Sequence, residues 1–160
     1  MNKVIIHISG ASGSGKTTLG IKLTEQFKNK IVLKDIDNLK RDFIQKYYGD
    51  NKFDIIDKLE YQKYIDNFVK KHSFKPLIFI GLNNIPHYDM HSTYNYFIDF
   101  DDYNMKMLVN NNKQYIKNLS IDIDYECNLK NKWKEYYMKQ GYKFMSRENI
   151  FKNVSKILQD

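Results

Sequence analysis

The stretch from Gly10 to Thr17 combines glycines, hydroxyl side chains and a lysine in an order that suits phosphate binding. It matches the pattern G-x-x-x-x-G-K-[ST], called Walker A, at every position: Gly10, Ala11, Ser12, Gly13, Ser14, Gly15, Lys16 and Thr17. Glycines allow a tight turn whose inward-pointing backbone N–H groups cradle phosphate oxygens. Lys16 would reach the β- and γ-phosphates of a nucleoside triphosphate, and the Thr17 hydroxyl would bind Mg²⁺. We therefore predict a nucleotide site, with ATP as the expected ligand.

The segments on either side of this loop are the ones that the chemistry needs. Val4 to Ile8 is rich in β-branched side chains and is followed by glycines, which predicts a buried strand. From Lys16 to Lys28, apolar side chains recur every four residues, which predicts a helix. The loop would then lie at a helix N-terminus, where the helix dipole favours an anion. A glycine-rich turn without a ligand is the alternative, and the two flanking elements argue against it.

The rest of the chain predicts strands that alternate with helices. Further strands are expected at 31–33, 76–80, 93–100 and 142–145, and helices at 38–48, at 54–72 and over much of 102–140. Ser146 is expected to cap a last helix. This alternation indicates an α/β fold with a parallel sheet. We expect three layers, α/β/α, around a mostly parallel five-stranded sheet, in one domain that covers residues 1–160.

Two carboxylates, Asp35 and Asp37, follow the second predicted strand. Because the carboxyl ends of parallel strands share one edge of a sheet, both acids are expected near the Gly10–Thr17 loop. Phosphoryl transfer needs little more than a γ-phosphate held in line, its charge neutralised, and a nucleophile oriented by a carboxylate. Asp37 also has a purely structural interpretation, as the N-cap of the helix that is expected to begin near Asn38.

The loop, extended by Thr18, and the segment from Lys34 to Leu39 resemble the small P-loop kinases, which include nucleoside, nucleotide, shikimate and gluconate kinases. The acidic pair is similar to the D-x-D of shikimate-kinase-like enzymes. The resemblance implies a P-loop kinase fold, with ATP and Mg²⁺ as cofactors. It also implies that Asp35 helps to hold the metal and that Asp37 orients or deprotonates the acceptor. It covers roughly the first quarter of the chain, and beyond that it rests on element order and length.

The chain has two arginines, Arg41 and Arg147, among its 26 basic residues. Arg41 follows Asp37 by about one helical turn. In related kinases an arginine in this region often grips a phosphate or carboxylate of the acceptor, which suits the guanidinium fork. The loop that carries Arg147 passes the adenine in the resembled fold, which implies a stacking or ribose contact. For each arginine the alternative is an exposed helix residue.

The third predicted strand departs from the pattern of many P-loop proteins, because no acid follows it to position Mg²⁺ or water. This weakens a motor or GTPase interpretation, whereas a kinase could take the metal-binding acid from Asp35. Gly81 could let the backbone approach an acceptor, with Asn83 or Asn84 hydrogen-bonding to it. A plain structural turn before Pro86 is the alternative.

The resembled kinases close an arginine-bearing lid over the phosphates. The corresponding region, at about 103–124, contains no arginine. Lys106, Lys113 and Lys117 could act there as point charges, although they lack bidentate geometry. The alternative is an exposed, lysine-rich helix face.

The composition limits the partners and the compartment. The net charge of +7 favours anionic partners, although a lysine excess alongside Asn, Ile and Tyr also fits an AT-rich coding genome. No run of about 18 apolar residues suggests a membrane span, so we expect no membrane partner. With Cys127 as its one cysteine the chain forms no internal disulfide, and a cytoplasmic location is expected.

These observations favour an ATP-dependent phosphotransferase that acts on a small acceptor, with nucleosides and nucleotides as the leading class. Two alternatives stay open. The basic charge is also compatible with a polynucleotide 5′-kinase, so nucleic acid is a possible but not favoured partner. The arginine-free lid is also compatible with a non-catalytic ATP-binding protein.

Overall fold

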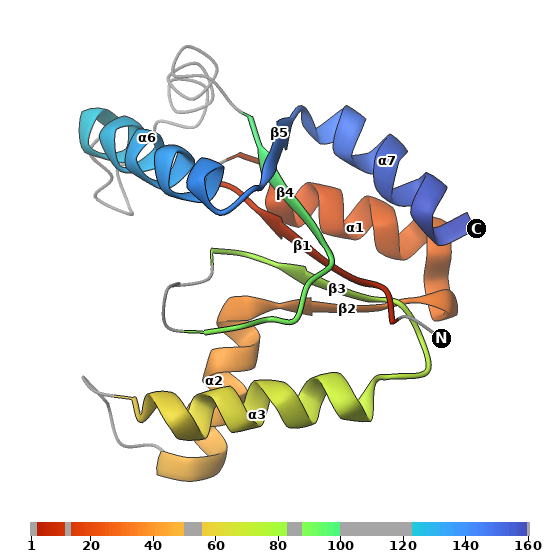
Figure 1. The fold of residues 1–160 in the computed structure, drawn as a ribbon, viewed down its shortest axis with the longest axis vertical. Helices are drawn as coiled ribbons and strands as arrows, with labels where there is room; N and C mark the ends of the chain where they lie inside the picture. The colour runs from red at the N-terminus through yellow and green to blue at the C-terminus, as the bar shows by residue number, and fades with distance from the viewer. Residues whose placement is uncertain (1–2, 12–13, 50–55, 83–87, 100–122, 160) are drawn as a thin grey trace, which may run out of the picture.

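The strand that leads into the Gly10–Thr17 loop, β1 (Ile5–Ser9), lies at the centre of a five-stranded sheet (Figure 1). The computed structural model describes residues 3–11, 14–49, 56–82, 88–99 and 123–159. The other strands are β2 (Val32–Asp35), β3 (Leu77–Ile80), β4 (Tyr94–Ile98) and β5 (Lys143–Met145). Their order is β2-β3-β1-β4-β5, and every pairing is parallel. The predicted sheet of five strands is confirmed, and it is parallel throughout.

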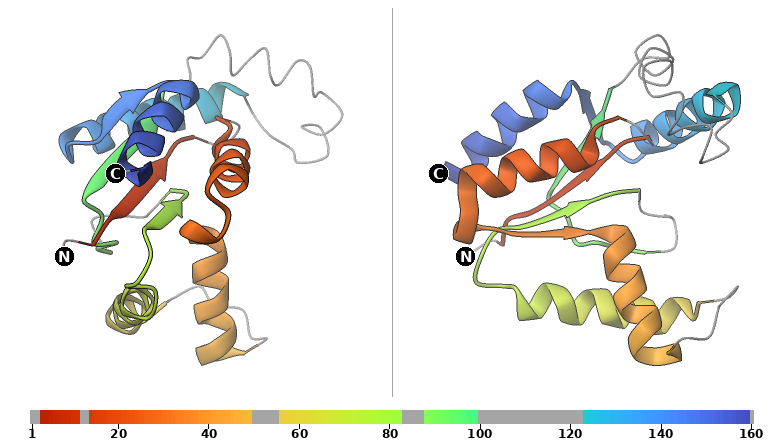
Figure 2. Two further views of the ribbon diagram at one scale, coloured as in Figure 1. Left: turned by 90° about the vertical axis from the view of Figure 1, so that its right-hand side faces the viewer. Right: turned by 180° about the vertical axis from the view of Figure 1, so that it is seen from behind.

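Helices cover both faces of this sheet, which gives the three layers expected from the sequence (Figures 1 and 2). On one face lie α1 (Lys16–Phe27), which ends in the short 3-10 turn η1 (Lys28–Lys30), and α7 (Arg147–Gln159). On the other lie α2 (Ile36–Tyr48), α3 (Lys58–Lys71) and α6 (Ile123–Lys139). The α/β fold class is therefore confirmed.

The side chains of β1 divide between two hydrophobic cores, because alternate residues of a strand point to opposite faces. Ile6 and Ile8 pack with residues of α1 and α7, such as Leu19 and Val154. Ile5 packs on the other face with the residues of β3, α2 and α3 that form the second core. Full burial of a large apolar side chain contributes about 1.5–3 kcal/mol, so both cores hold β1 firmly in place. The loop thus starts from a central strand that is packed on both faces.

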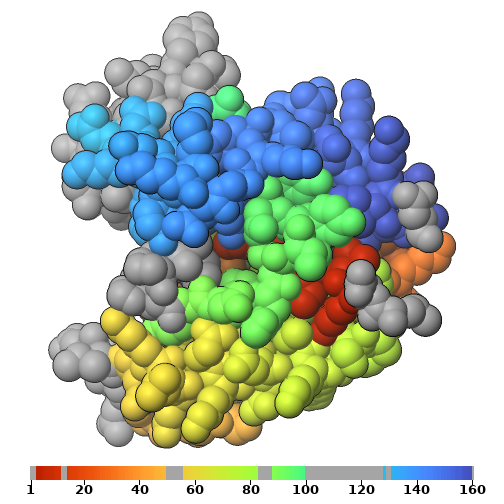
Figure 3. Space-filling model, in the orientation of Figure 1, coloured from red at the N-terminus to blue at the C-terminus, as the bar shows by residue number. Residues whose placement is uncertain are grey.

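The strand register brings the ends of three strands to the same level. Asp35, the last residue of β2, is level with Ile80 of β3, and Ile80 is level with Ile8 of β1. The Gly10–Thr17 loop and Asp35 therefore lie at the carboxyl edge of the sheet. In the space-filling view α6 and α3 stand apart on the left side of the molecule, on either side of a recess (Figure 3).

Several element boundaries differ from the sequence-based predictions. β2 continues to Asp35 and α2 starts directly afterwards at Ile36, two residues before the predicted start. α3 starts at Lys58 because Asp57 caps it, accepting a hydrogen bond from the N–H of Glu60 at 3.0 Å. The predicted lid at 103–124 lies outside the described residues except for its last two, which begin α6. None of the helices in the described ranges is long and apolar enough to cross a membrane.

Candidate functional site

α1 begins without the side-chain cap that other helices of the described chain carry. Its N-cap is Gly15, which has a φ of 92°, makes no side-chain cap hydrogen bond and is followed by no acid in the first turn. In contrast, α2 and α3 have aspartate caps and an acid in their first turns. The first N–H groups of a helix have no intrahelical partner, and the dipole there favours negative charge. The start of α1 is therefore suited to an external anion.

Lys16 folds back over the loop. Its Nζ donates hydrogen bonds to the carbonyl oxygens of Gly10, at 2.5 Å, and Ala11, at 2.9 Å. Burial lowers the pKa of Lys16 to about 8, while the negative charges of Asp37 and then Asp35 act to raise it. Asp35 and Asp37 thus both lie close enough to Lys16 to affect its pKa. A bound anion would further favour the charged form of the lysine.

The remaining loop residues pack tightly. A β-carbon on Gly10 would lie 2.6 Å from the Oγ of Ser14, so a larger residue would have to displace that hydroxyl. The hydroxyls of Ser14 and of Ser9, at the end of β1, are buried and have no hydrogen-bond partner among the described residues. Unsatisfied buried polar groups are rare in folded proteins and call for an explanation such as a bound ligand or water. Ser12 and Gly13 lie outside the described residues.

Thr17 and Asp35, the two predicted Mg²⁺ ligands, line one cavity of about 340 Å³ together with Asn38. Asp35 Oδ1 caps α2 by accepting from the N–H groups of Asp37, at 2.8 Å, and Asn38, at 3.2 Å. Its second oxygen takes no part in this cap. Hydroxyl and carboxylate oxygens suit Mg²⁺, which keeps several waters and needs few protein ligands. The described residues contain no cluster of three or more His, Cys, Asp or Glu that could hold a metal.

Asp37 is exposed in the first turn of α2, and it does not cap that helix. The capping interpretation of Asp37 is therefore wrong: Asp35 is the cap, because β2 runs straight into α2. The charge of Asp37 acts on Lys16 and also on the hydroxyl of Tyr61. That hydroxyl is buried and has no hydrogen-bond partner in the described part of the chain. Burial, followed by the neighbouring Tyr88 and Asp37, raises its pKa. Asp37 thus lies near both Lys16 and Tyr61 of α3.

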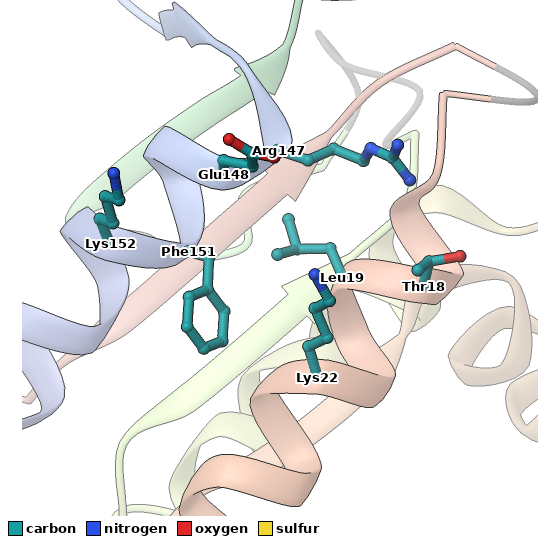
Figure 4. A pocket seen from close by; sticks show the side chains of 7 residues that line it. All are labelled: Thr18, Leu19, Lys22, Arg147, Glu148, Phe151 and Lys152. Atoms are coloured by element: carbon teal, nitrogen blue, oxygen red, sulfur yellow. The ribbon is translucent and has the colours of Figure 1, made fainter.

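The two arginines lie on different sides of the loop. Arg41 is exposed on α2, and its Nη1 is 3.5 Å from the Oδ1 of Asn38, so it extends toward the start of that helix. Arg147 leaves the start of α7 and points toward the start of α1 (Figure 4). There it lies against Gly15 of the loop. Together with Thr18, Arg147 lines a cavity of about 430 Å³ between α1 and α7.

Gly81 uses both of its backbone polar groups within the protein. Its N–H donates to the carbonyl of Ile8 at 3.0 Å, and its carbonyl accepts from His7 Nε2 at 2.8 Å. Its φ is 132°, and a β-carbon would lie 3.3 Å from the Cβ of Ile36. These contacts favour the structural interpretation of Gly81 over an approach to the acceptor. Asn83, Asn84 and Pro86 lie outside the described residues.

The sequence did not point to two groups that the fold brings to this edge. His7 is fully buried in β1, where Nε2 donates to Gly81 and Nδ1 accepts from the Tyr142 hydroxyl at 2.6 Å. Burial lowers its pKa to about 4, so the ring is neutral at pH 7. A lone histidine within a buried strand was the available signal. Tyr61 gives no signal at all, since it looks like any apolar residue of an amphipathic helix.

Comparisons with known proteins bear on the fold. No protein-family model matches the sequence, and no curated protein matches it. An uncharacterized protein from Eubacterium ventriosum ATCC 27560 is similar over 99% of both chains, with 15% identity and a TM-score of 0.55. TT1252 from Thermus thermophilus is similar over 99% of both chains, with 13% identity and a TM-score of 0.52. These two likenesses show a shared fold. A thymidylate kinase from Ehrlichia chaffeensis aligns over 100% of both chains, with 16% identity and a TM-score of 0.48.

Proposed function

We propose that this protein is an ATP-dependent phosphotransferase that acts on a small acceptor, with nucleosides or nucleotides as the favoured class. The observation that carries the proposal is the convergence on Lys16 of two acids from the next strand and helix, at the uncapped start of α1. A phosphate loop alone supports binding only. A carboxylate near the lysine adds the group that orients a nucleophile for phosphoryl transfer.

The loop holds the triphosphate in this proposal. Backbone N–H groups at the start of α1 bind phosphate oxygens, and Lys16 exchanges its contacts with the Gly10 and Ala11 carbonyls for the β- and γ-phosphates. The hydroxyl of Thr17 and the second carboxylate oxygen of Asp35 would hold Mg²⁺ from the cavity that they line together. The metal would supply positive charge that offsets the charge of the phosphates.

Asp37 orients the acceptor hydroxyl toward the γ-phosphate. Its position supports this role, because its charge acts on both Lys16 and Tyr61. Tyr61 packs edge-on against Tyr88, with ring centroids 4.6 Å apart, and lies 5.0 Å from the ring of Phe43. Tyr61 and Phe43 are buried, so these rings belong to the core beside Asp37 and do not themselves offer a face to a nucleobase. Arg41, further along α2, could bind an acceptor phosphate.

The experiment is a transfer assay with γ-labelled ATP and Mg²⁺ against nucleosides, nucleoside monophosphates, small hydroxylated metabolites and 5′-hydroxyl oligonucleotides. We expect label transfer to at least one small acceptor. Asp37→Asn should reduce turnover by about 10²-fold or more while leaving ATP affinity within a few-fold, because general-base catalysis contributes about 10²–10⁴-fold. Lys16→Ala should weaken ATP binding itself.

Asp42→Asn provides a matched control on the same helix. Asp42 pairs with Lys34 at 2.6 Å on the exposed side of α2, so this variant should keep full turnover. Tight ATP binding with no transfer to any acceptor would contradict the proposal and favour a non-catalytic nucleotide-binding protein. Transfer restricted to oligonucleotides, with salt-dependent affinity, would identify a polynucleotide 5′-kinase instead.

A further inference from the structure

The side chain of Arg147 lies on the loop rather than beside it. A β-carbon on Gly15 would be 2.6 Å from Arg147 Cδ and 2.9 Å from its Cζ, so the guanidinium end rests on the bare α-carbon of the α1 N-cap. Figure 4 shows the side chain extending from the start of α7 toward the start of α1. This contact brings a planar cation to the start of α1, and a side chain at position 15 would meet the arginine there.

The charged side chains around Arg147 are mostly positive. Helix N-termini carry a partial positive charge and normally attract acids. The cavity between α1 and α7 is lined by three cations, Lys22, Arg147 and Lys152, against one carboxylate, Glu148. Within the described ranges no carboxylate forms an ion pair with Arg147. An anion bound at the start of α1 would offset this concentration of positive charge.

We propose that Arg147 binds the phosphates of the nucleotide from the α7 side of the loop, in place of the base or ribose contact expected from the sequence. The inference rests on the proposed binding of ATP by the loop. Its warrant is position and shape: the guanidinium lies over the residue that opens the anion-binding turn, and its fork matches two phosphate oxygens at once. Because the predicted lid contains no arginine, Arg147 supplies a guanidinium from the start of α7 instead.

Inorganic tripolyphosphate separates a phosphate contact from a base contact, because it has neither base nor ribose. Its affinity and that of ATP would be measured by displacement of a fluorescent ATP analogue from the wild type, Arg147→Ala and Arg147→Lys. A charge-assisted contact predicts that Arg147→Ala weakens both ligands by a similar factor, about 10- to 100-fold. Arg147→Lys should be intermediate, since it keeps the charge and loses the fork.

Lys156→Ala is the matched control, because it removes an exposed cation from the same helix away from the loop. It should change neither affinity, and thermal unfolding should show that α7 stays packed in all variants. Weaker ATP binding with unchanged tripolyphosphate binding would overturn the proposal in favour of a base or ribose contact. Unchanged binding of both ligands in Arg147→Ala, while Lys16→Ala loses both, would also overturn it but leave the proposed function intact. If Lys16→Ala also binds both ligands normally, the role of the loop itself is wrong.

Discussion

Asp35 Oδ1 accepts a hydrogen bond from the backbone N–H of Asp37 at 2.8 Å. The two acids of the Asp35–Ile36–Asp37 segment are thereby given different tasks. Asp35 uses one carboxylate oxygen to cap the start of α2, and it lines the same cavity as Thr17. Asp37 is the second residue of α2 and is exposed, and its charge acts on Lys16 and Tyr61.

This division predicts that two substitutions of Asp35 will behave differently. Asparagine caps helices about as well as aspartate, so Asp35→Asn should leave stability nearly unchanged but raise the Mg²⁺ concentration needed for half-maximal turnover. Asp35→Ala should raise that concentration too and also lose about 1 kcal/mol of unfolding free energy. Urea unfolding and Mg²⁺ titration of turnover would be compared. Equal Mg²⁺ dependence in the wild type and Asp35→Asn would remove Asp35 from the metal site.

The lowered pKa of Lys16 leads us to expect that ATP affinity depends on pH. Burial lowers the pKa of Lys16 to about 8 in the free protein, and a bound triphosphate must raise it because the charged lysine is preferred beside phosphate. Affinity should therefore be constant below about pH 7.5. It should fall by up to about tenfold for each pH unit above 8, until the pKa of the bound state is reached. Calorimetric titrations from pH 6.5 to 9.5 would measure this. Lys16→Arg, which stays charged throughout, should abolish the decline even if its affinity is lower.

The contact between Arg147 and Gly15 predicts non-additive stability effects. Gly15→Ala should destabilise the protein, since a φ of 92° costs a β-carbon about 1–2 kcal/mol and the new methyl group also meets the Arg147 side chain. Adding Arg147→Ala should recover the part of the loss that comes from the clash. Urea unfolding of both single variants and the double variant would form a thermodynamic cycle. Strict additivity would show that Arg147 does not rest on Gly15 in solution.

The burial of His7 leads us to expect that the free energy of unfolding falls in mild acid. The pKa of this buried ring is lowered from the usual 6.5 to about 4, so below pH 6.5 the unfolded chain takes up a proton that the folded chain refuses. This group should therefore remove about 2 kcal/mol of unfolding free energy between pH 7 and pH 5. His7→Phe should be less stable at pH 7 because Gly81 and Tyr142 lose their partner, yet should lose less stability on acidification. Unfolding at both pH values gives the comparison, and identical pH slopes would exclude a buried neutral His7.

Local pattern predicted the elements of this fold well, because burial and turn chemistry are written into short stretches of chain. The run before Gly10, the four-residue spacing in α1 and the serine at 146 each gave the correct element; the Oγ of Ser146 accepts from the N–H of Asn149 at 3.2 Å. The start of α2 was predicted two residues late. Both Asp35 and Asp37 have good capping chemistry, and only the point at which β2 stops pairing with β3 decides between them.

By itself the sequence determined the α/β class and predicted a phosphate-binding loop, because both depend on neighbours along the chain: hydrophobic period, glycine positions, and a lysine followed by threonine. Only the tertiary structure decided which side chains meet at that loop. Asp37 acts on Lys16 and Tyr61, and Arg147 lies on Gly15 although 132 positions separate them in the chain. Such contacts depend on strand order and register, which bring distant segments to one edge of the sheet. The local composition of the sequence does not predict them.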